Sequence, residues 1–382
     1  MTATSQLVTA GDLGTFRGGS GFPLRLQGRK SGDLPFFKVS DMNNSGNELF
    51  MRRANNYISE AERKALGATR FPAGAIVFAK VGAAVFLERK RILAQDSCID
   101  NNMAGFIVDQ DRIDVRFAHY FITTFKMSSL VATTALPSLN GSQLRSIPLL
   151  VPEDPQEQRR IAAALSDVDY LIAALERMIA KKEAIKQGMM QQLLTGKTRL
   201  PGFMTPWREC AMGDVLTVRH GKNQSAVENP RGLYPILATG GQIGRATMPL
   251  YSKPSVLIGR KGTIDRPQYM ALPFWTVDTL FYTEIDASTD PRYLYYVFLT
   301  IDWRSMNEAS GVPSLSTSRV EGVEIRLPEI DEQRAIREVL DTADREIVLL
   351  RRRLRKARDA KQGMLQELLT GHTRLRVEEG AA

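Results

Sequence analysis

The feature of this sequence that most constrains its fold is an internal repeat. Residues 157–200 align without gaps on residues 332–375, at a constant offset of 175, and 22 of the 44 positions are identical. Both copies begin with Glu-Gln-Arg, and both later contain Lys-Gln-Gly-Met followed by Leu-Leu-Thr-Gly. A match of this length at a single offset indicates two units built on the same plan.

The repeat continues more faintly through the rest of each unit. Pro-Ser-Leu occurs at 137–139 and again at 313–315. An apolar run that ends in a basic residue and a glycine occurs at 77–82 and again at 257–262. The chain therefore consists of two related units of roughly equal length, and the first three-quarters of each unit has diverged strongly from its counterpart.

The well-matched quarter of each unit is predicted to form one long helix. Its apolar residues recur at alternating spacings of four and three, the pattern of a coiled-coil seam. About forty residues at 1.5 Å each would make a rod of roughly 60 Å. Gly196 and Gly371 stand where helix C-caps belong. Two such rods most simply pack against each other, antiparallel, since a globular block separates them in the chain. The predicted seam consists of Ile161, Leu165, Val168, Ile172, Leu175, Ile179, Ile336, Leu340, Ala343, Ile347, Leu350 and Leu354.

The diverged parts are predicted to be compact blocks of mixed strands and helices. Short apolar runs such as 75–79 and 255–258 are typical of strands, and turn signals such as Asn140-Gly141 and Gly240-Gly241 bound them. We therefore expect an α+β protein in which two globular blocks are separated by two long helices that form an antiparallel coiled coil with pseudo-twofold symmetry. The predicted boundaries are 1–152 for the first block, 153–197 for the first helix, 198–328 for the second block, 329–372 for the second helix and 373–382 for a C-terminal tail.

Composition narrows the class of protein. The 382 residues are 43% hydrophobic and 24% charged, which excludes disordered, collagenous and disulfide-stapled chains. The net charge of +9 permits a polyanionic partner without demanding one. Cys98 and Cys210 stand in different halves, which fits a reducing compartment. No apolar run approaches the roughly 18 residues of a membrane span, and the N-terminus does not resemble a signal peptide. We therefore expect a cytoplasmic protein without a membrane partner.

No catalytic or metal-binding constellation is apparent in the sequence. The histidines, His119, His220 and His372, do not have the spacing of a metal cluster, and no Gly-x-Ser-x-Gly elbow supports a serine nucleophile. Residues 196–198 (Gly-Lys-Thr) resemble the end of a phosphate-binding loop. They follow a predicted helix, however, and their repeat copy lacks the lysine, so a helix cap is the better interpretation. We therefore predict no catalytic residue and no metal ligand in this chain.

Taken in order, these phrases resemble the specificity subunit of type I restriction-modification systems. The resemblance covers nearly the whole chain and rests on the order block, helix, block, helix, with Pro-Ser-Leu and Glu-Gln-Arg before each helix and Leu-Leu-Thr-Gly at its end. Within the blocks, residues 36–42 and 258–263 look like that family's target-recognition domains. The resemblance implies that each block is such a domain and that Arg374–Ala382 supplies a strand closing a circular, pseudo-twofold arrangement.

The resemblance also implies a function. A subunit of this family is a non-catalytic reader of double-stranded DNA, in which each recognition domain reads one half of a bipartite, asymmetric site. The helices set the spacing between the halves and dock methyltransferase subunits, two in number. The methyltransferase subunits would carry S-adenosylmethionine, and Mg²⁺ and ATP would likewise belong to partner subunits, among them a restriction subunit. We therefore expect no cofactor in this chain.

Arg260 and Lys261 are the leading candidates for DNA contact, because glycines flank them directly after a predicted strand. An arginine there can bind guanine bidentately, which is worth about 1–3 kcal/mol of discrimination. A solvated turn explains either residue equally well. Lys80 occupies the place of Arg260 in the first block, and this repetition favours a role in function.

Further basic residues are expected on loops of the two blocks. For each residue alone, a solvated surface charge is the better explanation, whereas as a set some should contact phosphates. The main candidates are Lys222, Arg89, Arg91, Arg52 and Arg245, followed by Arg53, Lys90, His220 and Arg266. Amide side chains that can read adenine edges are Asn43, Asn44, Gln242 and Asn223, although turn formation is the better explanation for the first two.

Two other classes of function remain open from the sequence. The chain could be a DNA methyltransferase or nuclease that acts alone, and methyl transfer by the purified chain would support that class. It could also be a coiled-coil adaptor without DNA binding. An adaptor predicts partner binding that is insensitive to salt, whereas a DNA reader should lose affinity steeply as salt rises.

Overall fold

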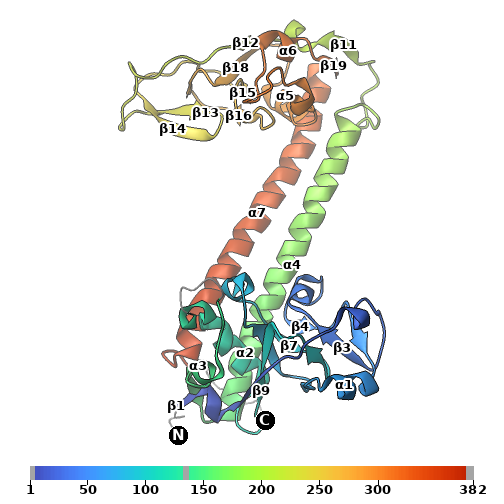
Figure 1. Ribbon diagram of the computed structural model, residues 1–382. Helices are drawn as coiled ribbons and strands as arrows, with labels where there is room; N and C mark the ends of the chain where they lie inside the picture. Colours follow the sequence, from blue (N-terminus) through green and yellow to red (C-terminus); the bar gives the residue numbers. More distant parts are fainter. Residues whose placement is uncertain (1–4, 132–136, 376–382) are drawn as a thin grey trace. The chain divides into compact units, whose positions relative to one another are not determined.

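The computed structural model describes residues 5–131 and 137–375. The chain falls into two compact units, and the boundary between them lies inside both long helices (Figure 1). One unit is Met1–Ala174 with Leu354–Ala382, and the other is Leu175–Arg353. Each unit therefore contains one block and one segment of each long helix.

The first block is built around a mixed sheet in the order β2-β9-β6-β7-β4, with a smaller sheet β5-β3-β8 and the pair β1-β10. Strands β6 and β9 are antiparallel and almost fully buried, so they form the centre of the block. The strands are β1 (Ser5–Thr9), β2 (Gly14–Gly18), β3 (Leu34–Phe37), β4 (Phe50–Met51), β5 (Tyr57–Ile58), β6 (Ile76–Ala79), β7 (Lys90–Leu93), β8 (Cys98–Ile99), β9 (Met103–Val108) and β10 (Pro148–Pro152). The helices are α1 (Glu60–Leu66), α2 (Val115–Thr124) and α3 (Gly141–Arg145).

The second block has a four-stranded sheet in the order β12-β18-β15-β16, a smaller sheet β14-β13-β17 and the pair β11-β19. Its central strand β15 is fully buried. The strands are β11 (Arg208–Ala211), β12 (Leu216–Arg219), β13 (Tyr234–Ala238), β14 (Gly241–Ala246), β15 (Ser255–Gly259), β16 (Gln268–Met270), β17 (Trp275–Thr276), β18 (Leu280–Ile285) and β19 (Glu324–Leu327). The helices are α5 (Pro291–Phe298) and α6 (Thr317–Glu321).

The two blocks share one topology despite their divergent sequences. The order β2-β9-β6-β7 of the first block corresponds to β12-β18-β15-β16 of the second. In both small sheets, the middle strand pairs in parallel with a later strand, β3 with β8 and β13 with β17. The predicted α+β class and the pseudo-twofold repeat are confirmed.

The predicted long helices are α4 (Pro155–Leu193) and α7 (Ile330–Leu369). Both are followed by a glycine with left-handed backbone, at φ +70° for Gly196 and +72° for Gly371. Thr198 then donates its backbone N–H to the Gln192 carbonyl at 3.2 Å, and its repeat copy Thr373 makes the same bond to Glu367. Residues 196–198 therefore form a helix cap, as predicted.

The helices run antiparallel in each unit. In the second unit, Lys186 of α4 binds Asp344 of α7 at 2.5 Å, and Glu183, earlier in α4, binds Arg351, later in α7. In the first unit, Asp169 of α4 binds Lys361 near the end of α7 at 2.6 Å. In both segments the partner position falls along α7 as it rises along α4, so the predicted antiparallel pairing is confirmed.

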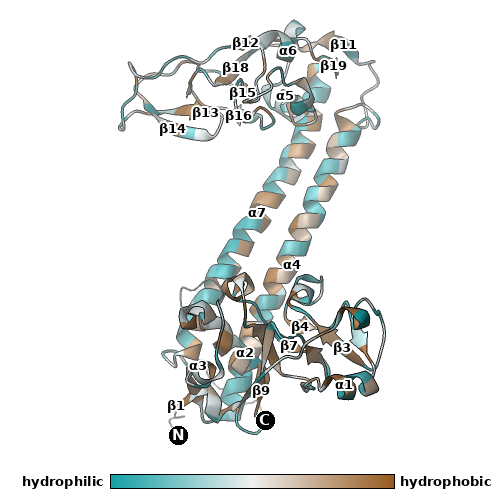
Figure 2. Cartoon of the chain, in the orientation of Figure 1, coloured by the Kyte–Doolittle hydropathy of each residue, from teal (hydrophilic) through white to brown (hydrophobic). Residues whose placement is uncertain are grey.

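The predicted seam positions are mostly enclosed, and hydrophobic bands alternate with hydrophilic ones along both helices (Figure 2). Val168, Ile172 and Ala343 are half-buried, and the other nine are buried. The first two seam positions of each helix also belong to the core of a block. Ile161 and Leu165 lie in one cluster with Phe117 of the first block, and Ile336 and Leu340 lie in another that contains Trp303 of the second.

The phrases that bound the helices form contacts that recur in both units. Gln158 accepts a hydrogen bond from the Asp114 N–H at 2.8 Å, and Gln333 accepts the equivalent bond from Asp290, also at 2.8 Å. The residue before each glutamine is a glutamate that faces the arginine after the other helix, Glu157 with Arg374 and Glu332 with Arg199. The repeated sequence therefore fixes each helix start to its block and to the end of the other helix.

Some local expectations need revision. Asn140-Gly141 does not form a turn between strands, because the Asn140 side chain accepts the Gln143 N–H at 2.9 Å and caps α3. Of the predicted closing strand, residues 376–382 lie outside the described part of the chain, and the described Arg374 and Leu375 are not in a strand. Among the described residues, no helix is both long and apolar enough to cross a membrane.

Candidate nucleic-acid interface

The loop that follows the central strand has the same backbone arrangement in both blocks. The loop is Lys80-Val81-Gly82 after β6 and Arg260-Lys261-Gly262 after β15. The third residue has left-handed backbone in both, at φ +76° for Gly82 and +88° for Gly262, which glycine adopts without strain. We refer to these two segments as the basic loops.

Each basic loop is held by the Pro-Ser-Leu phrase of its own unit. Leu139 donates its backbone N–H to the Lys80 carbonyl, and Gly82 donates to the Pro137 carbonyl, both at 2.9 Å. In the second block, the corresponding donations run from Leu315 to Arg260 at 2.9 Å and from Gly262 to Pro313 at 2.8 Å. The basic loop and the Pro-Ser-Leu segment, far apart in the sequence, thus form one hydrogen-bonded unit in each block. The loop backbone is therefore held in place without a ligand.

A second contact orders the loops from the opposite side. The Lys80 N–H donates to the Asn102 carbonyl, and the Arg260 N–H donates to the Thr279 carbonyl, each at 2.8 Å. Strand β17, just before this turn, accepts the Lys222 N–H through the Thr276 carbonyl at 2.8 Å. Of the predicted DNA-binding residues, the structure therefore brings Lys222, Arg260 and Lys261 together around residues 276–279.

The side chains of the two basic loops differ although their backbones match. The Arg260 side chain, 28% exposed, pairs with the carboxylate of Asp278, which is 63% exposed. Lys261 is exposed beside it. Lys80 is half-buried, and its ammonium lies over Gly18, where an added Cβ would be 2.8 Å from Nζ. The same scaffold therefore offers a guanidinium and an ammonium in one block and a single ammonium in the other.

The remaining predicted contacts lie apart from the basic loops. Arg245 is exposed on β14 and donates to the Gly232 carbonyl at 3.0 Å, and Arg52 is exposed with its guanidinium carbon 5.2 Å from the Phe50 ring centre. Arg89 is half-buried and donates to the Asn43 side chain. Arg91 is half-buried within β7, where burial lowers the pKa of its guanidinium.

Lys90 was expected on a loop, and this placement is wrong. It begins strand β7, only 2% of the residue is exposed, and its ammonium binds the Glu88 carboxylate and donates to the Phe125 carbonyl at 3.0 Å. Burial lowers the pKa of this ammonium, while Glu88 opposes the shift. Because β7 pairs with the central strand, its alternate side chains enter the core. Lys90 is a structural residue of the first block.

The four amide candidates all form hydrogen bonds within their own blocks. Asn44 donates to the Arg53 carbonyl at 3.0 Å, and Asn223 accepts the Ser225 N–H at 2.8 Å. Gln242 donates to the Gly244 carbonyl at 3.1 Å, and Asn43 accepts from Arg89. These contacts agree with turn formation for Asn44.

A tyrosine, an aspartate and a lysine connect each block to the helix pair, a feature that sequence reasoning missed. Tyr120 of α2 donates its hydroxyl to Asp169 at 2.8 Å, and Lys361 binds the same aspartate at 2.6 Å. In the other unit Tyr296, Asp344 and Lys186 repeat the arrangement, with distances of 2.7 and 2.5 Å. Burial, with the neighbouring carboxylates adding to it, raises the pKa of both tyrosines, so they remain donors at neutral pH.

The sequence contained a signal for these contacts. Asp169 and Asp344 are identical pairs of the 175-residue repeat, and so are Lys186 and Lys361, although none occupies a seam position. An identity outside the seam needs a reason other than helix pairing. Here the reason is that these residues attach each block to the pair of long helices.

The described residues contain no group of three or more His, Cys, Asp or Glu side chains arranged to hold a metal ion. Cys98 and Cys210 are both buried, free thiols.

Comparison with known proteins defines the class. The family model for the type I restriction modification DNA specificity domain matches the chain twice, over residues 3–187 and 204–357. The chain therefore belongs to this family, and it contains two copies of the domain. The resemblance noted in the sequence is confirmed, as is the expectation of a specificity component in place of a catalytic one.

Named relatives agree with the family. A Mycoplasma pneumoniae protein named "Putative type I specificity subunit S.MpnORF638P" is 28% identical over 155 residues, covering 37% of this chain and 40% of that protein. The specificity subunit of the type I restriction enzyme MjaVIII from Methanocaldococcus jannaschii is 22% identical over 294 residues, 65% of this chain and 68% of that protein. The alignment with the first of these relatives thus spans less than half of its length.

A solved structure supports the fold over most of the chain. The S subunit of a type I restriction-modification system from M. genitalium superimposes with a TM-score of 0.68 at 16% identity, covering 96% of each chain. At this identity the likeness concerns the fold, including the block, helix, block, helix order.

Proposed function

We propose that this chain is the DNA-reading subunit of a type I restriction-modification complex, with recognition domains at 1–152 and 198–328 that each read one half of a bipartite site. The observation that carries the proposal is the pair of basic loops. Their backbones are held by the same hydrogen bonds in both blocks, yet they present Lys80 in one block and Arg260 with Lys261 in the other. A common scaffold with different side chains is what reading two different half-sites requires.

The pairing of Arg260 with Asp278 suggests how this loop would meet DNA. An exposed ion pair is weak in water, so the guanidinium can exchange Asp278 for a guanine edge, where a bidentate contact discriminates by about 1–3 kcal/mol. Lys261 and Lys222 lie beside the same turn and would bind phosphates, which position a protein on the duplex. Arg52, Arg89, Arg91 and Arg245 complete the proposed DNA-contacting set.

The rest of the complex follows from the family. The antiparallel helices would set the distance between the half-sites and dock two methyltransferase subunits, with a restriction subunit as a further partner. A structure that matches this chain at a TM-score of 0.57 is described as showing complex assembly and conformational transition of a type I R-M system. S-adenosylmethionine, Mg²⁺ and ATP would then be bound by those partners, and the assembly would work in the cytoplasm on cellular DNA.

Methylome sequencing of cells with and without the chain tests this function. We expect a bipartite methylated motif that disappears with the chain and returns with the wild-type copy. The variant Arg260→Ala with Lys261→Ala should relax or abolish one half of the motif, and Lys80→Ala should act on the other half. Arg334→Gln, at an exposed position on α7, is a matched control that should leave the motif intact.

The alternatives predict different results. A chain that acts alone would methylate or cut DNA as the purified protein. A coiled-coil adaptor would leave the methylome unchanged when deleted. Loss of both half-sites in every loop variant, at unchanged protein level, would contradict the assignment of one half to each block.

A further inference from the structure

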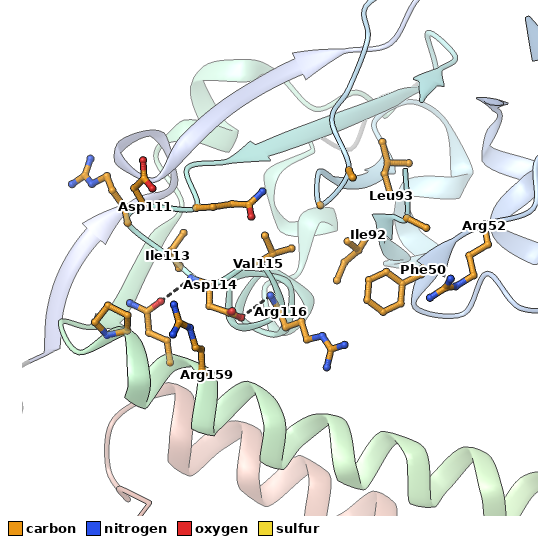
Figure 3. Close-up of a pocket in the computed structure, with 17 residues that line it drawn as sticks. Phe50, Arg52, Ile92, Leu93, Asp111, Ile113, Asp114, Val115, Arg116 and Arg159 are labelled. Carbon is orange, nitrogen blue, oxygen red and sulfur yellow. Dashed lines mark hydrogen bonds between the residues drawn. The ribbon is translucent and has the colours of Figure 1, made fainter. Parts of the chain in front are cut away.

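The first unit contains a hollow of about 620 Å³ whose wall carries several arginines (Figure 3). It lies between the edge of the main sheet, the start of α2 and the start of α4. Arg52, Arg116 and Arg159 contribute exposed side chains, and Phe50 stands between the first two. We call this feature the arginine hollow.

The guanidinium groups of the arginine hollow are arranged by an aromatic ring. The guanidinium carbons of Arg52 and Arg116 lie 5.2 and 5.7 Å from the centre of the Phe50 ring. A ring at this distance attracts the cations through its face but does not act as a conventional hydrogen-bond acceptor for their N–H groups. The donors of both arginines therefore remain available to a ligand.

No carboxylate neutralises these arginines. Among the described residues, Arg52, Arg116 and Arg159 form no ion pair with a carboxylate. Asp111 and Asp114 also line the hollow (Figure 3). Within the described ranges, Asp111 forms no ion pair with the three arginines, and the Asp114 carboxylate accepts the N–H groups of Arg116 and Phe117 and caps α2. The starts of the 10-residue α2 and the 39-residue α4 add the positive ends of two helix dipoles.

In the second unit, the two arginines at the same positions each form an ion pair, one of them partly buried and the other exposed. Arg292, the counterpart of Arg116, binds Asp341 at 2.9 Å, and Arg334, the counterpart of Arg159, binds Asp331 at 3.4 Å. Through the 175-residue offset, the residues in place of these two aspartates in the first unit are Ser166 and Gln156.

The internal repeat thus acts as its own control. The second unit pairs both arginines with carboxylates, and the first unit leaves its two arginines facing a hollow. The difference comes from the two carboxylates and not from the arginines, which are present in both copies. Retaining unpaired arginines at the protein surface, where the sister copy neutralises them, indicates a ligand that supplies the missing negative charge.

We propose that the arginine hollow binds phosphate groups and that the DNA backbone brings them there. Planar guanidinium groups match phosphate oxygens bidentately. Gly74 at the hollow precedes β6, and Lys80 in the basic loop follows it. The four residues of this strand span about 13 Å. The hollow would therefore bind backbone phosphates at some distance from the bases that the basic loop contacts. It would do so at the half-site of the first block only.

This inference rests on the proposed function for the source of the phosphate, but not for the phosphate chemistry itself. The experiment therefore uses two probes on the full-length chain. The first is duplex DNA, with affinity measured by fluorescence anisotropy over a series of NaCl concentrations. The second is pyrophosphate, with affinity measured by calorimetry.

Three variants separate the possibilities. Arg52→Gln with Arg116→Gln should lower the slope of log affinity against log salt by about 1.8, since each phosphate contact contributes about 0.9. Ser166→Asp restores the carboxylate of the second unit and should lower the slope by about 0.9 while keeping every arginine. Arg334→Gln is the matched control, already paired in the second unit, and should change neither slope nor pyrophosphate affinity. A thermal melt shows whether each variant is folded.

The DNA slope and the pyrophosphate affinity together distinguish a DNA-phosphate site, a site for another phosphate and no site. A lower slope on DNA with and without the methylated motif supports the proposal. Loss of pyrophosphate affinity with an unchanged DNA slope supports the phosphate site but overturns DNA as its source, leaving a free nucleotide. An unchanged slope together with unchanged pyrophosphate affinity in the double arginine variant overturns the site altogether. If the wild-type chain fails to bind DNA, the proposed function is contradicted. The pyrophosphate measurement still shows whether the arginine hollow binds phosphate.

Discussion

A buried histidine makes the stability of the first block depend on pH. His119 of α2 is 6% exposed, and its Nε2 donates to the Lys90 carbonyl at 3.2 Å. Burial lowers its pKa from 6.5 to about 4, with Arg91 and Lys361 adding to the shift. The folded block therefore holds the neutral imidazole, whereas the unfolded chain takes up a proton below pH 6.5.

The consequence is a loss of stability in acid. Because the folded-state pKa lies below the unfolded-state value, His119 contributes no penalty above pH 6.5 and destabilises increasingly between pH 6.5 and about pH 4. The total is about 3 kcal/mol. Urea unfolding of wild type and His119→Gln at pH 7, 6 and 5 checks this, since other groups titrate equally in both. Parallel pH curves for the two proteins would contradict it.

The contact between the chain after α4 and the start of α7 contains a buried charge. The Glu332 side chain is 2% exposed and accepts from Arg199 at 2.6 Å and from the Trp207 indole at 3.0 Å. In the other unit, Arg374 and Glu157 face each other at 3.7 Å, and the Arg374 side chain is 40% exposed. The same pair of the repeat is therefore tight in one unit and loose in the other.

Removing each arginine should reveal this difference. Arg199→Met leaves a buried carboxylate without its partner and should destabilise the second unit by about 3–5 kcal/mol. Arg374→Met, the matched control, should cost less, because the Arg374 side chain is 40% exposed and its contact with Glu157 is longer, at 3.7 Å. Denaturant unfolding of both variants provides the measurement. A loss of stability in Arg199→Met as small as that expected for Arg374→Met would show that the Glu332 carboxylate is stabilised mainly by Trp207.

At the scale of the whole molecule, the helices of the repeat are proposed to set the spacing of the half-sites. Seven residues inserted after Ala174 in α4 and seven after Arg353 in α7 preserve the seam, because a heptad keeps the apolar stripe on one side. The insertion lengthens each helix by about 10.5 Å, which is about three base pairs of DNA. Methylome sequencing should then show the same half-sites separated by about three more bases.

An insertion in α4 alone is the control. It shifts every ion pair between α4 and α7 beyond the insertion, including Lys186 with Asp344, and should destabilise the helix pair without producing a new motif. An unchanged spacing with the double insertion would mean that another part of the complex determines the distance between the half-sites.

The sequence by itself determined the architecture of this protein. The 175-residue repeat, its seam spacing and the glycines at 196 and 371 were sufficient to predict two long helices, their pairing and two blocks of one plan. These features are local or periodic, so each is readable from residues near one another in the chain. The same repeat also identified the family, which the comparisons confirm.

Only the tertiary structure decided which residues act together. Pro-Ser-Leu clamps a loop more than fifty residues before it, Lys90 is enclosed because β7 pairs with β6, and Arg116 is left unpaired because Ser166 stands where the second unit has Asp341. Contacts of this kind depend on how distant segments meet, and a linear pattern of basic residues carries no record of it. The sequence shows where each arginine charge lies along the chain, but its neighbours in space decide whether that charge is available to DNA.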